Sequence, residues 1–230
     1  MSYSIPPVSL PPVSICPQNR YEFARATLAR LRTELPLPKV FDIGAGGAQM
    51  RAPLEQDGFL WRGFNHAAGV AGVEAWDLDE ARPDLAGQTG AVLLLDVIEH
   101  CLNPSLALRH AAETIAPGGF LILTVPNPRW SGSRVHNLVY GYASGFTPHD
   151  LMENHHVFVP WPHFIARLIA GVGLTISSYT TLDGATTLWQ MPGARRGLSR
   201  VALNAVQMAI EWRDRTAIGM SYALIARKPL

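Results

Sequence analysis

The sequence has few cysteines, no marked excess of charge of either sign and no long apolar run. Its 230 residues include only Cys16 and Cys101, which excludes a disulfide-stapled scaffold and a cysteine-rich zinc site. The 19 lysines and arginines are balanced by 18 aspartates and glutamates, without the basic excess of proteins that bind duplex nucleic acid. No apolar run of about 18 residues occurs, so no transmembrane segment is expected. These absences predict a cytoplasmic protein that does not bind duplex nucleic acid.

The residues that are present predict a folded α/β protein. Hydrophobic residues make up 48% of the chain and charged residues 16%, which is typical of a domain with a substantial core. Short apolar segments alternate with segments of helical periodicity, and this alternation favours a parallel sheet with helices on both faces. Strands are expected at 39–43, 59–64, 73–76, 91–96, 120–125, 174–182 and 219–228, and helices at 19–35, 48–57, 104–116 and 162–173.

Two segments depart from this alternation. Residues 1–18 are rich in proline, which favours extended backbone without hydrogen bonds, so we expect a flexible arm ahead of a single domain over 19–230. Residues 127–160 carry proline, glycine, histidine and aromatic residues without a clean period. An irregular stretch of this length inside a domain is usually functional, so we expect an inserted lid.

A third segment, 195–212, is predicted to be an inserted amphipathic helix. We expect its apolar side to be core or a dimer interface, which leaves a homodimer as an option, and the alternative is a membrane surface. Glu211 and Asp214 count against the membrane. The apolar side comprises Leu198, Val201, Ala205, Met208, Ala209 and Trp212, and the helix starts with Arg195, Arg196 and Arg200.

A glycine cluster, Gly44-Ala45-Gly46-Gly47, follows the strand expected at 39–43. Glycines allow a sharp turn and a close approach of a ligand to the backbone, and the carboxyl end of a parallel strand is where open α/β sheets bind ligands. The dinucleotide-binding pattern fails because Gln49 occupies the position of its last glycine, and no Gly-Lys-Ser/Thr follows as in a P-loop.

Three motifs in order, VFDIGAGGAQM, LLLDVIEHCLNP and IAPGGFLILTVPNP, resemble the class I S-adenosylmethionine-dependent methyltransferases. The nearer branch contains ubiquinone-biosynthesis O-methyltransferases and bacterial type 11/23-like methyltransferases, and the resemblance covers about residues 20–182. It implies a Rossmann-like, doubly wound, mostly parallel seven-stranded sheet with an antiparallel last strand. It also implies S-adenosylmethionine as cofactor and a small-molecule methyl acceptor, for which we expect a hydroxyl.

The same resemblance implies where the cofactor is bound. Asp42 would lie near the methionine amino group, although it could instead bond loop amides. Asn65 stands where the family has an acid that binds both ribose hydroxyls, which removes a charge-assisted bond. Asp77 would meet the adenine, although it could simply cap a turn. The implied contacts are Asp42, Gly44, Ala45, Gly46, Asn65, Asp77, Leu78, Asp96 and Val97.

Methyl transfer to a hydroxyl needs a base, because the acceptor loses a proton. His155 and His156, in the lid, are the predicted catalytic residues, since an imidazole titrates near neutral pH. Metal-dependent relatives resemble the chain in an acid-x-x-Glu-His pattern, so an alternative is a divalent metal on Asp96, Glu99, His100 and His156. We expect no metal.

Two other functions stay open. One is metal-dependent 2′-O-methylation of RNA, against which the balanced charge counts. The other is a catalytically silent methyltransferase-like scaffold. Two features favour it, the departure from the family at Asn65 and the proline-rich arm.

Overall fold

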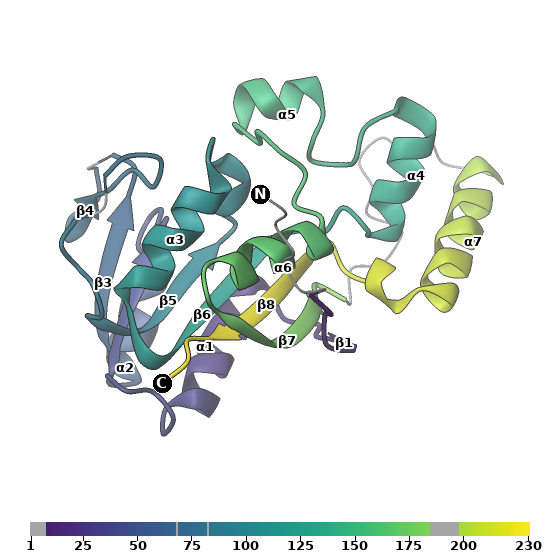
Figure 1. Cartoon of the computed structure of the whole chain (residues 1–230). Helices are drawn as coiled ribbons and strands as arrows, with labels where there is room; N and C mark the ends of the chain where they lie inside the picture. The colour runs from purple at the N-terminus through teal and green to yellow at the C-terminus, as the bar shows by residue number, and fades with distance from the viewer. Residues whose placement is uncertain (1–7, 68, 82, 185–197) are drawn as a thin grey trace, which may run out of the picture.

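An eight-stranded sheet organises the chain, in the order β1-β7-β8-β6-β5-β2-β3-β4 (Figure 1). The computed structural model describes residues 8–67, 69–81, 83–184 and 198–230. All strand pairs are parallel except those of β8, which runs antiparallel to both β6 and β7. The strands are β1 (Val13–Ile15), β2 (Lys39–Ile43), β3 (Leu60–Asn65), β4 (Val73–Ala75), β5 (Thr89–Leu95), β6 (Ile115–Pro126), β7 (Thr175–Leu182) and β8 (Ser221–Arg227).

Helices cover both faces of this sheet, as the alternation predicted. On one face, α3 (Pro104–Thr114) and α6 (Pro162–Gly171) contribute apolar side chains to one buried cluster. On the other face, α1 (Arg20–Leu31) and α2 (Arg51–Gln56) contribute to a second cluster. Strand β5 serves both, because its side chains alternate between the two clusters and every residue of it is buried. The doubly wound α/β fold with an antiparallel last strand is therefore confirmed.

The number of strands differs from the expectation of seven. The eighth is β1, which lies within the segment expected to be a flexible arm and pairs in parallel with β7 at the sheet edge. The backbone amide of Cys16 extends this ladder to Thr181 at 2.8 Å. Prolines are tolerated beside an edge strand because one side of it needs no donors. Residues 1–7 lie outside the described part of the chain.

Strand β6 begins earlier than predicted. It starts at Ile115 and includes Pro117-Gly118-Gly119, which we had expected to end a helix and precede the strand. Two glycines make this possible, because a Cβ on Gly119 would lie 2.5 Å from the carbonyl oxygen of Gly90 on β5. The register of the β5–β6 pair shifts at this point, because Thr89 pairs with Ile115 whereas Ala91 pairs with Phe120.

The expected lid, 127–160, is more regular than its sequence suggested. It holds α4 (Ser131–Tyr140) and α5 (Pro148–Glu153), both beyond one end of the strands (Figure 1). Helix α5 starts with a capping box, in which Thr147 and Asp150 bond each other's backbone amides, and α4 ends at Gly141 with φ +80°. Both signals are present in the sequence, and the lack of an apolar period hid them.

The amphipathic helix is α7 (Leu198–Arg213), which packs beside α4. The structure contradicts the interpretation of its apolar side as core. Val201, Met208 and Trp212 are exposed, whereas Asn204 and Gln207 are buried. The polar side of α7 instead contacts polar atoms of α4, since Ser131 Oγ donates a hydrogen bond to Glu211 Oε1 at 2.6 Å. Residues 195–197 of the predicted helix lie outside the described residues.

Among the helices of the described residues, none is both long enough and apolar enough to cross a membrane.

Candidate functional site

A cavity of about 540 Å³ opens where β2, β3, β4 and β5 end at their carboxyl termini. Its volume is in the range of pockets that hold a cofactor-sized ligand. The lining is Ile43, Gly44, Asn65, His66, Trp76, Asp77, Leu78, Asp79, Asp96, Val97, His100, Cys101, Leu102, Asn154 and His155. Of the nine predicted cofactor contacts, Gly44, Asn65, Asp77, Leu78, Asp96 and Val97 line it, and Asp42, Ala45 and Gly46 do not.

The glycine loop is tied to the neighbouring strand at the cavity wall. The amides of Gly44 and Ala45 both donate to the carbonyl oxygen of Phe64 on β3, at 2.8 and 2.9 Å. Gly44 has φ +81°, and a Cβ there would lie 2.3 Å from Cγ2 of Val97, a side chain of the cavity lining. Gly46, at φ +52°, is exposed, and a Cβ there would meet only Oε1 of Gln49, at an ordinary 3.5 Å. Gly44 is therefore the position where a side chain would narrow the cavity.

Asp42 is a buried carboxylate that meets no cation among its recorded contacts. It is the next-to-last residue of β2, is 3% exposed and accepts a hydrogen bond from the indole nitrogen of Trp61 at 3.1 Å. Burial raises its pKa to about 6, against which the Trp61 bond acts. The expected alternative, a carboxylate bonded to loop amides, is not what the structure records. A positively charged group of a ligand would stabilise the ionised form of this buried carboxylate.

The strands next along the sheet bring polar groups to the same cavity. Asn65 ends β3, and its carbonyl oxygen accepts from the amide of Trp76 at 2.7 Å. Asp77 does cap a turn, since its Oδ1 accepts from the amide of Asp79 at 2.9 Å, and it also lines the cavity. Asp79 in turn accepts from the amides of Leu102 and Asn103. These bonds join the two cavity walls.

Asp96 is held by two side chains, neither of which the sequence interpretation named. Arg20 donates to Asp96 Oδ2 and Thr124 donates to Oδ1, each at 2.7 Å, and Asp96 itself has φ +56°. Arg20 is the first residue of α1, directly after the N-cap Asn19. It is half-buried, and its Nε is buried without a hydrogen-bond partner. The sequence offered one signal for Arg20, its position at the start of a helix. This position follows the N-terminal segment in which β1 pairs with β7.

The predicted metal set comes together in part. Ligand atoms of Glu99, His100 and His156 lie within 4.8 Å of one another, whereas Asp96 is outside this group. Glu99 is fully buried, and neither of its carboxyl oxygens has a hydrogen-bond partner. Burial, and then the charge of Asp96, raises its pKa well above the usual range. Burial and the neighbouring His156 lower the pKa of His100, which favours the neutral imidazole that binds metals. An orphaned buried carboxylate with two imidazoles fits a divalent cation.

The two predicted catalytic histidines occupy different surroundings. His155 is exposed, has φ +56° and lines the cavity. His156 is half-buried, with its ring 4.8 Å from that of His100 and 5.2 Å from that of Phe146. Nδ1 of His156 is paired with the carbonyl oxygen of Gly145, which leaves Nε2 as the nitrogen with a free lone pair. Of these two histidines, only His155 is among the residues that line the cavity.

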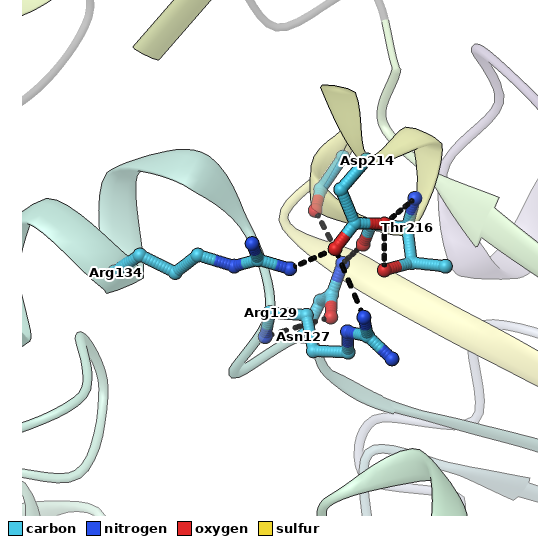
Figure 2. Close-up of polar contacts among 6 residues, drawn as sticks. Asn127, Arg129, Arg134, Asp214 and Thr216 are labelled. Carbon is cyan, nitrogen blue, oxygen red and sulfur yellow. Dashed lines mark hydrogen bonds and ion pairs between the residues drawn. The ribbon is translucent and has the colours of Figure 1, made fainter. Parts of the chain in front are cut away.

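A polar cluster anchors the lid to the sheet (Figure 2). Asp214, after α7, accepts from Thr216 Oγ1 at 2.6 Å, from Arg129 at 2.9 Å and from Arg134 on α4. Asn127, at the end of β6, donates to the carbonyl oxygens of Thr216 and Gly219, both at 3.0 Å. Hydrogen bonds from Thr216 and the two arginines lower the pKa of Asp214 against the effect of burial. These contacts fix the start of the lid and helix α4 to the segment after α7. We call the lid together with α7 the lid lobe.

Comparison with known proteins places this chain in a family. The model of a methyltransferase domain family matches residues 18–179, which include the glycine loop and all of the cavity lining. A ubiquinone biosynthesis O-methyltransferase of Azorhizobium caulinodans is 30% identical over 128 residues, which cover 47% of this chain and 51% of that protein. The chain spans about half the length of the curated relatives that it matches.

Solved structures share the fold at low sequence identity. A SAM-dependent methyltransferase from Archaeoglobus fulgidus superposes with a TM-score of 0.61 at 17% identity, covering 90% of this chain and 94% of that one. The cyclase SpnF superposes with a TM-score of 0.59 at 16% identity, covering 91% and 82%. Since a cyclase shares the fold, the architecture alone does not determine the reaction.

Proposed function

This chain belongs to the methyltransferase domain family, and we propose that it transfers a methyl group from S-adenosylmethionine to a hydroxyl of a small-molecule acceptor. The observation that carries the proposal is the cavity of about 540 Å³ at the carboxyl ends of four neighbouring strands, lined by Gly44, Asp77 and Asp96. The hydroxyl as acceptor is supported by the O-methyltransferase relatives, and the small size of the acceptor by the balanced charge of the chain.

Residues that line the cavity or lie beside it would bind and orient the two reactants. When bound, S-adenosylmethionine supplies an electrophilic methyl carbon on a positively charged sulfur. Asp42 would pair with its ammonium group and Arg20 with its carboxylate, while Asn65 would bond the ribose with neutral hydrogen bonds only. His155, which lines the cavity, would take the proton of the acceptor hydroxyl as the hydroxyl oxygen bonds to the methyl carbon; the bond from that carbon to sulfur would break, and S-adenosylhomocysteine would leave. Most of the rate would come from alignment of the reactants.

A transfer assay on a matched pair of glycine variants tests this function. We expect wild-type protein with methyl-labelled S-adenosylmethionine to label hydroxyl compounds in a panel of phenols, carboxylates, amines and transfer RNA. Gly44→Ala should lose at least about 100-fold in transfer, because the new Cβ forces Val97 into the cavity. Gly47→Ala is the control, because its Cβ would meet Gln49 at an ordinary 3.4 Å.

The outcomes separate the competing functions. Label in the RNA alone would favour the RNA methyltransferase, and a protein that binds the cofactor but labels nothing would favour the silent scaffold. If Gly44→Ala and Gly47→Ala transferred methyl groups equally well, the cofactor would not be bound beside Gly44 as proposed.

The second candidate is the same transfer with a divalent cation at Glu99, His100 and His156. The orphaned carboxylate of Glu99 is the observation that favours it. A bound cation would lower the pKa of an acceptor hydroxyl. On this hypothesis Glu99, His100 and Nε2 of His156 hold the ion, and Gly145 orients the His156 ring.

Calorimetric titration with Mg²⁺ or Mn²⁺, without cofactor or acceptor, tests the cation site directly. Should the site bind metal, Glu99→Gln is expected to weaken binding at least about 10-fold, because an amide replaces the anionic ligand. His149→Gln is the control, since His149 is exposed and outside the group. Absence of metal binding to the wild-type protein would leave His155 as base without a cation.

A further inference from the structure

Helix α7 is turned with its apolar side outward. Its buried positions in the described part are polar, Asn204 and Gln207, and they face the packed side of the helix. Met208 is 62% exposed and Trp212 is 88% exposed. We call the apolar side the outer face of α7, and it consists of Val201, Ala202, Ala205, Val206, Met208, Ala209 and Trp212, all exposed. A helix that exposes its apolar side marks an interaction surface rather than a core element.

The charges around this face are arranged by sign. Glu211 accepts from Ser131 of α4, and Asp214 is enclosed by Arg129, Arg134 and Thr216 (Figure 2). Both acids that counted against a membrane surface are therefore engaged within the lobe. Arg213 and Arg215, which follow the outer face, are exposed. The helix thus presents an apolar strip whose end carries positive charge.

The neighbouring helix adds apolar side chains to the same lobe. Leu138 on α4 is 85% exposed, and Val139 and Tyr140 are also exposed. Helices α4 and α7 pack on each other and project beyond the end of the sheet (Figure 1). An aromatic residue beside a cation, as in Trp212 and Arg213, suits the boundary between lipid headgroups and acyl chains.

A second copy of the chain is a poorer occupant of this face. A helix of 16 residues is about 24 Å long, and one side of it offers less than the ~800 Å² per partner of a stable interface. Two copies that meet through the same end would also bring their Arg213 and Arg215 side chains together. An anionic surface instead complements both the apolar strip and the arginines.

From these observations we propose that the outer face of α7 docks the protein on an anionic membrane surface. The helix lies in the plane of the membrane, with Met208 and Trp212 among the acyl chains and Arg213 and Arg215 at the lipid phosphates. This surface lies on the lobe that also carries the lid, so docking holds the lid at the lipid boundary. The proposal concerns binding alone and does not depend on methyl transfer.

Co-sedimentation of the full chain with vesicles tests the proposal. The vesicles contain phosphatidylcholine alone or phosphatidylcholine with phosphatidylglycerol. The wild type should bind the anionic vesicles, and binding should weaken with salt. The double variant Met208→Asp, Trp212→Asp should bind at least about 10-fold more weakly, because two charges replace the inserted side chains. Leu60→Asp on β3, at an equally exposed apolar position, should bind like the wild type.

An Arg213→Gln variant separates the charge from the apolar contribution. It should weaken binding to the anionic vesicles and leave binding to neutral vesicles unchanged. Circular dichroism checks that all variants are folded, which is expected because the changed side chains are exposed. A wild type that does not bind anionic vesicles, or a double variant that binds them equally well, overturns the proposal. A wild-type dimer in light scattering that the double variant converts to monomers overturns it in favour of a second copy.

Discussion

Replacing Asp42 by asparagine should stabilise the ligand-free protein at pH 7.5 and weaken cofactor binding at the same time. The wild-type carboxylate is ionised at this pH although it is 3% exposed, and burial raises its pKa from 3.8 to about 6. A shift of this size means that the ionised Asp42 destabilises the folded wild type by about 3 kcal/mol. The neutral amide of the variant avoids this cost. The amide oxygen can still accept the hydrogen bond from Trp61.

The stability gain should depend on pH. Because the pKa of Asp42 is raised, between about pH 4 and 6 the folded protein holds a proton that the unfolded chain has released, so wild-type stability falls as the pH rises through this window. The advantage of Asp42→Asn is therefore complete above about pH 6 and disappears below about pH 4. Urea unfolding at several pH values measures it.

The cost of the same substitution appears in ligand binding. Loss of a charge-assisted bond to the methionine ammonium should weaken S-adenosylmethionine binding about 10- to 100-fold. Asp57→Asn is the matched control, because Asp57 lies at the surface in an ion pair with Arg25, which lowers its pKa. That variant should lose a little stability and bind the cofactor normally. A destabilised Asp42→Asn, or one with unchanged affinity, would contradict the role given to this carboxylate.

Substitution of Arg20 by alanine should weaken binding of S-adenosylmethionine about 10- to 100-fold, without weakening binding of its decarboxylated form. Arg20 contacts Asp96 at the edge of the cavity and holds a buried Nε without a partner, which leaves it capacity for a ligand carboxylate. The decarboxylated compound keeps the sulfonium, the amine and the adenosine, so the difference between the two ligands reports on the carboxylate alone.

Arg25→Ala is the control for this experiment. Arg25 lies on the same helix and also pairs with an aspartate, Asp57, but at the surface. If Arg20→Ala weakens both ligands equally, Arg20 acts by holding Asp96 in place and does not contact the carboxylate. Calorimetric titration of each variant with both ligands distinguishes the two roles.

The sequence predicted the glycine loop and every strand except β1 because their signals are local. Strand β5 is a continuous apolar run, as expected for a strand buried on both faces, and Gly44 follows β2 where the turn requires φ +81°. The ion pair of Arg20 with Asp96 joins residues 76 positions apart, so no local pattern could reveal it. The group of Glu99, His100 and His156 was named in advance through the resemblance to metal-dependent relatives, although the structure leaves Asp96 outside it.

Of the options predicted for the apolar side of α7, the core was wrong for a physical reason. The spacing of its apolar residues correctly indicated a helix, and the usual assumption assigned the apolar side to the interior. The deciding contact lies in another element, because Ser131 of α4 offers a polar partner to Glu211. Periodicity defines the two sides of a helix, and only the tertiary partner decides which one is buried.

The central claim is that the cavity at the carboxyl ends of β2 to β5 binds S-adenosylmethionine. Calorimetric titration of the full chain at pH 7.5 tests it most directly. The expected result is one site per chain, competed by S-adenosylhomocysteine and lost in Gly44→Ala but not in Gly47→Ala. Absence of binding at millimolar cofactor, or binding that Gly44→Ala leaves unchanged, would contradict the claim.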